Sequence, residues 1–136
     1  MEKVNNFVFD ACGIIAFLRN EKGSEKAMQL FADEEISFFM HAITLGELYY
    51  DTLRMDRNKA LELFETVNEL GIQIIWNIDE KLIKVAADFK VNNKMSYADS
   101  YVLALAEIYN AQIISTDHHE FDAVEKNSNL RFYWLR

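Results

Sequence analysis

Five short apolar runs, separated by segments with helical spacing, constrain the fold of this chain more than any other feature. Each run has the length typical of a buried strand, and the runs cover residues 4–9, 36–40, 72–76, 111–116 and 130–135. The helical segments between them cover residues 11–18, 24–31, 44–54, 57–70 and 79–91, and a further helix begins at Ser96. Strands that alternate with helices favour a parallel sheet covered on both faces. We therefore predict an α/β fold, a three-layer sandwich with a mainly parallel sheet of about five strands.

Local signals mark where some of these elements begin and end. Thr44 and Glu47 occupy the two polar positions of a capping box, which predicts a helix that starts at Thr44. Gly71 ends the helix over residues 57–70, and the inward stripe of that helix is predicted to contain Leu61, Phe64, Val67 and Leu70. Residues 117–121 are predicted to form a loop or a single turn.

Composition bounds the class of protein. The chain has 136 residues, 51% of them hydrophobic, with neither a proline-rich linker nor an internal repeat, so we expect one domain over residues 1–136. The sequence contains one cysteine, no stretch like the core of a signal peptide and no apolar run near the roughly 20 residues that cross a bilayer. We expect a cytoplasmic protein without a membrane span. The net charge of −8 argues against a broad basic surface for nucleic acid but is compatible with a small acidic cation site.

Four acidic residues stand out by their settings. Asp10 and Asp117 each follow an apolar strand, Asp99 lies in the first turn of a helix rich in small residues, and Glu47 lies in an apolar and aromatic segment. In open parallel sheets, ligands bind beyond the carboxyl ends of the strands. The sequence therefore predicts that these acids meet at one edge of the sheet.

Each acid also has an ordinary structural explanation. Asp10 fits a helix N-cap, Asp99 fits a cap shared with Ser96, Glu47 fits the capping box and Asp117 fits a turn after a strand. Considered together, four converging carboxylates would raise one another's pKa values unless a cation lay among them. Carboxylates are the ligands that Mg²⁺ and Mn²⁺ prefer, whereas the sequence has no Cys-x-x-Cys pair for zinc.

Four segments of the chain resemble a known family. They are residues 7–12, 44–48, 96–100 and 113–121, and in this order and spacing they are similar to the motifs of PIN-domain nucleases, especially the VapC-type toxins of type II toxin–antitoxin pairs. The resemblance spans the chain from Val4 to about Trp134. It implies a PIN-like fold and a metal-dependent endoribonuclease that hydrolyses RNA phosphodiester bonds.

The resemblance also implies site residues and partners. Asp10, Glu47, Asp99 and Asp117 correspond to the family's catalytic, metal-binding acids, with Mg²⁺ or Mn²⁺ as the cofactor. Ser96, Cys12 and His118 become candidates for substrate contact or support of the ligands, although the family usually has Ser or Thr where Cys12 stands. Expected partners are RNA, a small antitoxin and a second copy of the chain in a homodimer. The antitoxin groove is placed near residues 14–18 and 48–53.

Other interpretations use the same residues. A PIN-like module could bind RNA or protein without cutting it. A haloacid-dehalogenase-like phosphatase needs a second Asp two residues after the first, where Cys12 stands, and a receiver domain needs a Lys after a late strand, where Asp117 is followed by His118. Both phosphoryl-transfer folds are therefore disfavoured by the sequence.

Overall fold

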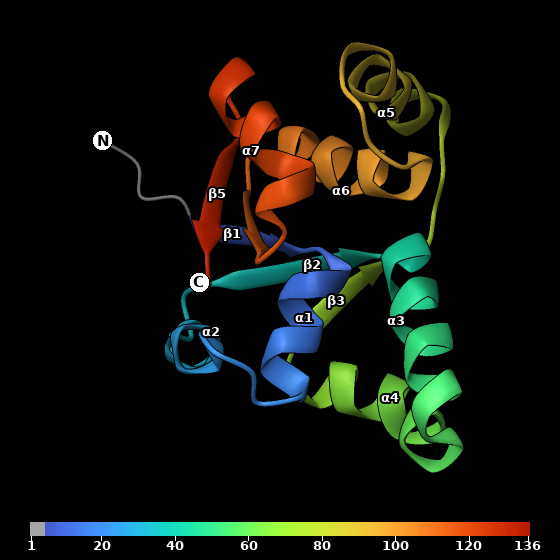
Figure 1. Ribbon diagram of the computed structural model, residues 1–136, viewed down its shortest axis with the longest axis vertical. Coiled ribbons are helices and arrows are strands. Elements are labelled where there is room, and N and C mark those ends of the chain that lie inside the picture. Colours follow the sequence, from blue (N-terminus) through green and yellow to red (C-terminus); the bar gives the residue numbers. More distant parts are fainter. Residues whose placement is uncertain (1–4) are drawn as a thin grey trace.

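The computed structural model describes residues 5–136 (Figure 1). The strands are β1 (Asn6–Phe9), β2 (Ser37–His41), β3 (Ile72–Ile75), β4 (Gln112–Ser115) and β5 (Arg131–Trp134). The helices are α1 (Ala11–Leu18), α2 (Ser24–Phe31), α3 (Ala42–Met55), α4 (Arg57–Glu69), α5 (Glu80–Asn92), α6 (Tyr97–Ile108) and α7 (His118–Asn127). The predicted start of the first strand at Val4 lies outside the described residues.

Across residues 5–136, the five strands form one parallel sheet in the order β3-β2-β1-β4-β5. β1 lies at the centre of the sheet, where Phe7, Val8 and Phe9 put apolar side chains on both of its faces. Val8 lies level with Phe39 of β2 and Ile113 of β4. A central parallel strand buried on both faces carries a continuous apolar run rather than an alternating one. The predicted α/β fold is confirmed.

Helices cover both faces of this sheet (Figure 1). α1 to α4 lie on one face and enclose a core that includes Phe7, Phe9 and Leu48. α5 to α7 lie on the other face, where Val8 and Tyr101 belong to a second core. Burying one such large apolar side chain stabilises the fold by about 1.5–3 kcal/mol. The two cores pack against opposite faces of β1, and this packing fixes the position of Asp10, the residue that follows the strand.

The start of α3 differs from the predicted capping box. The helix begins at Ala42, and its N-cap is His41, whose Nδ1 accepts a hydrogen bond from the backbone N–H of Ile43 at 3.0 Å. The prediction that Thr44 caps the helix is therefore wrong, and Thr44 lies inside the first turn. Consequently neither Thr44 nor Glu47 is needed as a cap.

The prediction of a loop or a single turn over residues 117–121 is also wrong. The chain forms helix α7, and the Asp117 side chain caps it by accepting a hydrogen bond from the backbone N–H of Glu120 at 3.1 Å. Phe121 and Val124 are three residues apart and bury one side of α7 in the second core. This burial holds a helix whose sequence is otherwise polar.

The apolar residues of α4 match the predicted inward stripe only in part. Val67 is buried as predicted, together with Ala60 and Leu63, whereas Leu61 and Phe64 are exposed by 64% and 49%. Ile14 and Leu48, which were assigned to a partner groove, are buried in the first core. None of the helices within residues 5–136 combines the length and apolar character that crossing a bilayer requires.

Candidate active site

The carboxyl ends of β1 and β4 place two of the four acids side by side. Phe9 pairs with Ile114, and the backbone N–H of Asp10 donates to the Ile114 carbonyl at 3.3 Å, extending the strand pairing by one residue. Asp117 follows β4 by two residues. α6 and α3 bring Asp99 and Glu47 to the same edge, where their charges act on one another.

Asp10 is the most enclosed of these acids, with 2% of its surface exposed. Its Oδ1 accepts from the backbone N–H of Gly13 and its Oδ2 from the Ser115 hydroxyl, both at 2.6 Å. Burial raises the pKa of Asp10 to about 7, the two hydrogen bonds oppose this rise, and the charges of Asp99 and Asp117 add to it. Asp10 thus caps α1, and burial destabilises the ionised form of its carboxyl.

Gly13 explains how a helix can lie so close to this edge. A Cβ at position 13 would lie 2.3 Å from the carbonyl oxygen of Ile114 and 3.1 Å from Asp10 Oδ1. Real Cβ atoms do not approach backbone this closely, so glycine lets the first turn of α1 rest directly on β4. Its N–H is then positioned to hold the Asp10 carboxyl.

Asp99 stands on the first turn of α6, as predicted. The Ser96 hydroxyl caps this helix by accepting from the backbone N–H of Asp99 at 3.1 Å. Burial raises the pKa of Asp99 to about 7, the hydrogen bond with Ser96 opposes it, and the charges of Glu47 and Glu120 raise it further. Ser96 therefore supports Asp99, and the backbone N–H of Ser96 is held by Glu120 Oε1 at 3.1 Å.

Glu47 carries a polar atom that the protein leaves unsatisfied. Its Oε1 is buried and has no hydrogen-bond partner within residues 5–136, and the same holds for the Thr44 hydroxyl, one turn earlier on α3. Burial also raises the pKa of Glu47. Buried polar atoms without partners are rare and call for a water or an ion.

Ser115 joins two of the acids and was missed by the sequence analysis. Its side chain is fully buried; its hydroxyl donates to Asp10 Oδ2 and accepts from the backbone N–H of Asp117 at 2.9 Å. A hydroxyl at the end of a buried strand, two residues before an acid, is the signal that could have identified it.

The match to a protein-family model settles the family. A PIN domain model matches residues 7–127, which covers most of the chain and all four acids. The chain belongs to the PIN domain family. No curated protein sequence gives a significant match.

Solved structures with this PIN fold include several toxin–antitoxin proteins. VapBC2 from Rickettsia felis, bound to a DNA fragment from its promoter, superposes with a TM-score of 0.72 at 12% identity, covering 95% of this chain and 98% of that one. VapC20 from Mycobacterium tuberculosis, a Sarcin-Ricin loop cleaving toxin, gives 0.66 at 15% identity and covers 87% and 94%. A toxin–antitoxin complex from Klebsiella pneumoniae gives 0.67 at 19% identity and covers 86% and 91%.

Cys12 stands at a position where the sequence analysis expected Ser or Thr. Its Sγ lies 4.0 Å from Asp117 Oδ2, a long contact from a weak donor. Burial raises the pKa of Cys12 to about 12, with further increases from the charges of Asp10 and Asp117. The group remains a thiol at neutral pH and is a poor nucleophile there.

His118 is near these acids in sequence but is bonded elsewhere in the PIN domain. Its Nδ1 lies 2.7 Å from Asp122 Oδ1 and its Nε2 lies 2.8 Å from the carbonyl oxygen of Arg136. The Arg136 carbonyl and Asp122 raise the pKa of His118. Both ring nitrogens are therefore occupied, and the structure does not bring them to the acids.

The chemistry of the donors fits a hard divalent cation. Within residues 5–136, no three His, Cys, Asp or Glu side chains form a ready-made metal cage. The four acids nevertheless supply only carboxylate oxygens, the ligands that Mg²⁺ and Mn²⁺ select. A bound cation would satisfy the unpartnered Glu47 Oε1 and offset the cost of ionising Asp10 and Asp99, whose pKa values are raised.

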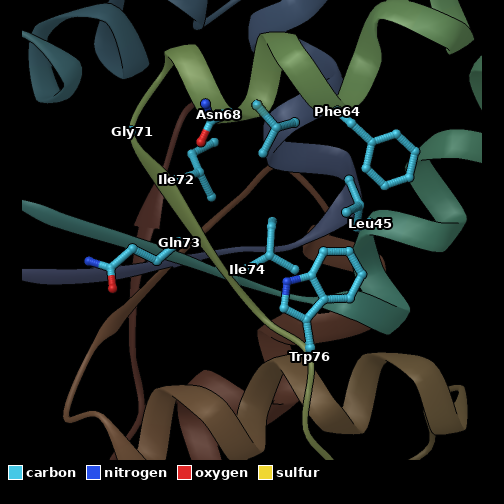
Figure 2. Close-up of a pocket in the computed structure, with 9 residues that line it drawn as sticks. Leu45, Phe64, Asn68, Gly71, Ile72, Gln73, Ile74 and Trp76 are labelled. Carbon is cyan, nitrogen blue, oxygen red and sulfur yellow. The ribbon is translucent and has the colours of Figure 1, made fainter.

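A hollow of about 560 Å³ lies apart from these acids, between α4 and β3 (Figure 2). Leu45, Phe64 and Trp76 give it apolar walls, with Asn68 and Gln73 as polar members. None of the residues that line it can titrate near neutral pH, so it offers neither a carboxylate ligand nor an acid or base for hydrolysis.

Proposed function

We propose that this PIN domain, a single domain over residues 1–136, is a metal-dependent endoribonuclease and the toxin of a type II toxin–antitoxin pair. The observation that carries the proposal is the unpartnered, buried Glu47 Oε1 beside acids whose pKa values are raised to about 7. A fold gains nothing from such a cluster by itself, because buried like charges repel and lose hydration. The cluster becomes favourable when it holds a cation.

Asp10, Glu47, Asp99 and Asp117 would hold Mg²⁺ or Mn²⁺. When bound, such an ion lowers the pKa of a coordinated water and stabilises charge that develops on the phosphate. The chain's own residues fix the ligands: Gly13 and Ser115 orient the Asp10 carboxyl, and Ser96 fixes the turn that carries Asp99. Cys12 stays a neutral thiol near Asp117, which argues against covalent catalysis.

The first test compares Asp99→Asn with Glu62→Gln, an exposed carboxylate on α4 far from the cluster. RNA cleavage is measured with Mg²⁺ and with Mn²⁺, and Mn²⁺ binding is measured by calorimetry. Asp99→Asn should abolish cleavage and weaken Mn²⁺ binding while its circular dichroism spectrum stays unchanged, and Glu62→Gln should behave as the parent does. Wild-type cleavage by Asp99→Asn would refute the mechanism. Mn²⁺ binding without cleavage of any RNA would favour a binding module instead.

The toxin role is supported by the kind of protein that shares the fold. The structural neighbours include VapBC and FitAB complexes, so we infer a small antitoxin partner, a homodimer and action on RNA in the cytoplasm. Expression of the chain alone should arrest growth, and co-expression with a neighbouring small reading frame should relieve the arrest and give a co-purifying complex. Normal growth with the chain alone, together with no complex, would refute the toxin role but leave the nuclease proposal standing.

A further inference from the structure

A stack of aromatic rings lies at the same edge of the sheet as the acid cluster. His118 begins α7 directly after Asp117, and its imidazole lies on the indole of Trp134, with ring centroids 3.8 Å apart and planes 18° from parallel. Phe132 stacks on Trp134 in turn, with centroids 5.1 Å apart and planes 11° from parallel. Phe132 and Trp134 pack against the second core, so the stack is on the face of the sheet that α6 covers.

One face of the His118 ring is left open by these contacts. The two nitrogens are engaged by Asp122 and by the Arg136 carbonyl, and the opposite ring face rests on Trp134. The side chain is nonetheless 46% exposed. The exposed surface must therefore be mainly the flat face that points away from Trp134, together with the carbon edge.

The stack lies close to the proposed reaction centre. Trp134 pairs in register with Ser115, whose hydroxyl binds Asp10, and β5 is two strands away from β1. Neighbouring strands are about 4.8 Å apart, which separates β5 from β1 by about 10 Å. A nucleotide adjacent to one held at Asp10 can reach the stack.

The open ring face of His118 favours contact with a base rather than with a phosphate. Its nitrogens cannot donate to a phosphate without breaking existing hydrogen bonds, and the carboxylates of Asp122 and Glu125 beside the stack would repel one. A flat aromatic face suits an unpaired base, and proteins recognise single-stranded RNA by such stacking. We propose that the open face of His118, backed by Trp134, stacks on a base of single-stranded RNA next to the phosphate that is cut. This inference rests on the proposed nuclease function.

Tryptophan fluorescence can report on this stack directly. The chain has two tryptophans, Trp76 and Trp134, so Trp76→Phe leaves Trp134 as the only one. Asp99→Asn in the same chain keeps the RNA intact during the measurement. Titration with an unstructured RNA hexanucleotide should change the emission of Trp134, and a hexamer of abasic nucleotides should bind more weakly with no such change.

Substitutions at His118 then separate stacking from other roles. His118→Ala should weaken hexanucleotide binding about 5- to 150-fold, the usual value of one base stacked on an aromatic ring. His118→Phe, which keeps a flat ring but no nitrogens, should retain most of the affinity. His119→Ala is the matched control, because His119 is the exposed neighbour outside the stack, and it should bind as the parent does.

The outcomes distinguish this inference from the nuclease proposal. If His118→Ala binds the hexanucleotide as tightly as the parent, or if the abasic hexamer binds equally well, the stacking inference is wrong. Cleavage by the otherwise unaltered chain, lost in Asp99→Asn, would then still support the nuclease. If the unaltered chain cleaves no RNA with either metal, the nuclease proposal fails independently of binding at His118.

Discussion

Two regions of this PIN domain differ in nearly every property used to locate a functional site. The α4–β3 hollow is roomy and apolar, and its lining residues carry no titratable group. The acid edge contains buried carboxyls with raised pKa values and an unpartnered Glu47 oxygen. We assign the functional site to the acid edge, because carboxyls whose pKa values are raised by burial and by neighbouring charges cluster at functional sites.

The largest expected difference between the two regions is in catalysis. Glu47→Gln should lower RNA cleavage by at least about 10²-fold, because several kcal/mol of charge stabilisation depend on the bound ion. Trp76→Ala, in the hollow, should leave the cleavage rate unchanged. Rates are compared in single-turnover assays with excess protein. Full activity in Glu47→Gln, or loss of activity in Trp76→Ala, would reverse the assignment of the two regions.

The second difference is in how stability responds to pH. The pKa of Asp10 is near 3.8 in the unfolded chain and about 7 in the folded one, so the folded state binds the proton more tightly. Without divalent ions, Asp10 should therefore lower the free energy of unfolding progressively as pH rises from about 4 to 7, by up to about 4 kcal/mol.

Urea unfolding at pH 4 and pH 8 in chelator measures this effect. Asp10→Asn should be more stable than the parent at pH 8, with little difference at low pH, and Mn²⁺ should stabilise the parent more than the variant. Phe64→Ala in the hollow should shift stability equally at both pH values. A parent whose pH dependence matches that of Asp10→Asn would show that Asp10 titrates normally.

A smaller effect is expected at Ser115, which shapes the acid edge without being an acid. Ser115→Ala removes the hydroxyl that joins Asp10 to Asp117, so cleavage should fall about 10-fold and stability by about 1–3 kcal/mol. Ser128→Ala removes a hydroxyl that binds only backbone groups on and after α7, and cleavage should not change. Equal cleavage by both variants would mean that Ser115 does not position the acids.

The smallest effect is expected at Cys12. A hydroxyl is a stronger hydrogen-bond donor than a thiol but would have to move closer to Asp117 than the 4.0 Å of the present contact, so Cys12→Ser should raise cleavage by about threefold or less. The native thiol, with a pKa of about 12, should react slowly with iodoacetamide at pH 7.5. Rapid alkylation that abolishes cleavage would show that the thiol is far more reactive than its burial allows.

The parts of this fold that follow from local chemistry could be predicted from the sequence. The strands could be predicted because each is an apolar run of the length typical of a buried strand. Asp10 and Asp117 could be predicted at strand ends because each follows such a run. The role of Ser115 could not be predicted, because its contact with Asp10 depends on the register between β1 and β4.

Other features depend on which side chains are buried by tertiary packing, and local sequence patterns do not determine that. α7 was predicted as a loop or a single turn because only Phe121 and Val124 mark its buried side. On α4, Val67 is buried as the predicted stripe requires, but the helix is rotated so that Leu63 is buried beside it while Leu61 and Phe64 are exposed. The roles assigned to the four acids remain predictions until the cleavage and binding experiments are done.

The long connection between Asp10 and Ser115 has a consequence for how the protein is made. These residues are hydrogen-bonded but 105 positions apart, and the central strand β1 obtains its β4 neighbour only late in synthesis. A nascent chain that has produced Asp10 and Glu47 still lacks Asp99, Ser115 and Asp117. Translation must pass Asp117 before the four acids can assemble, so a shorter nascent chain cannot hold the complete acid cluster.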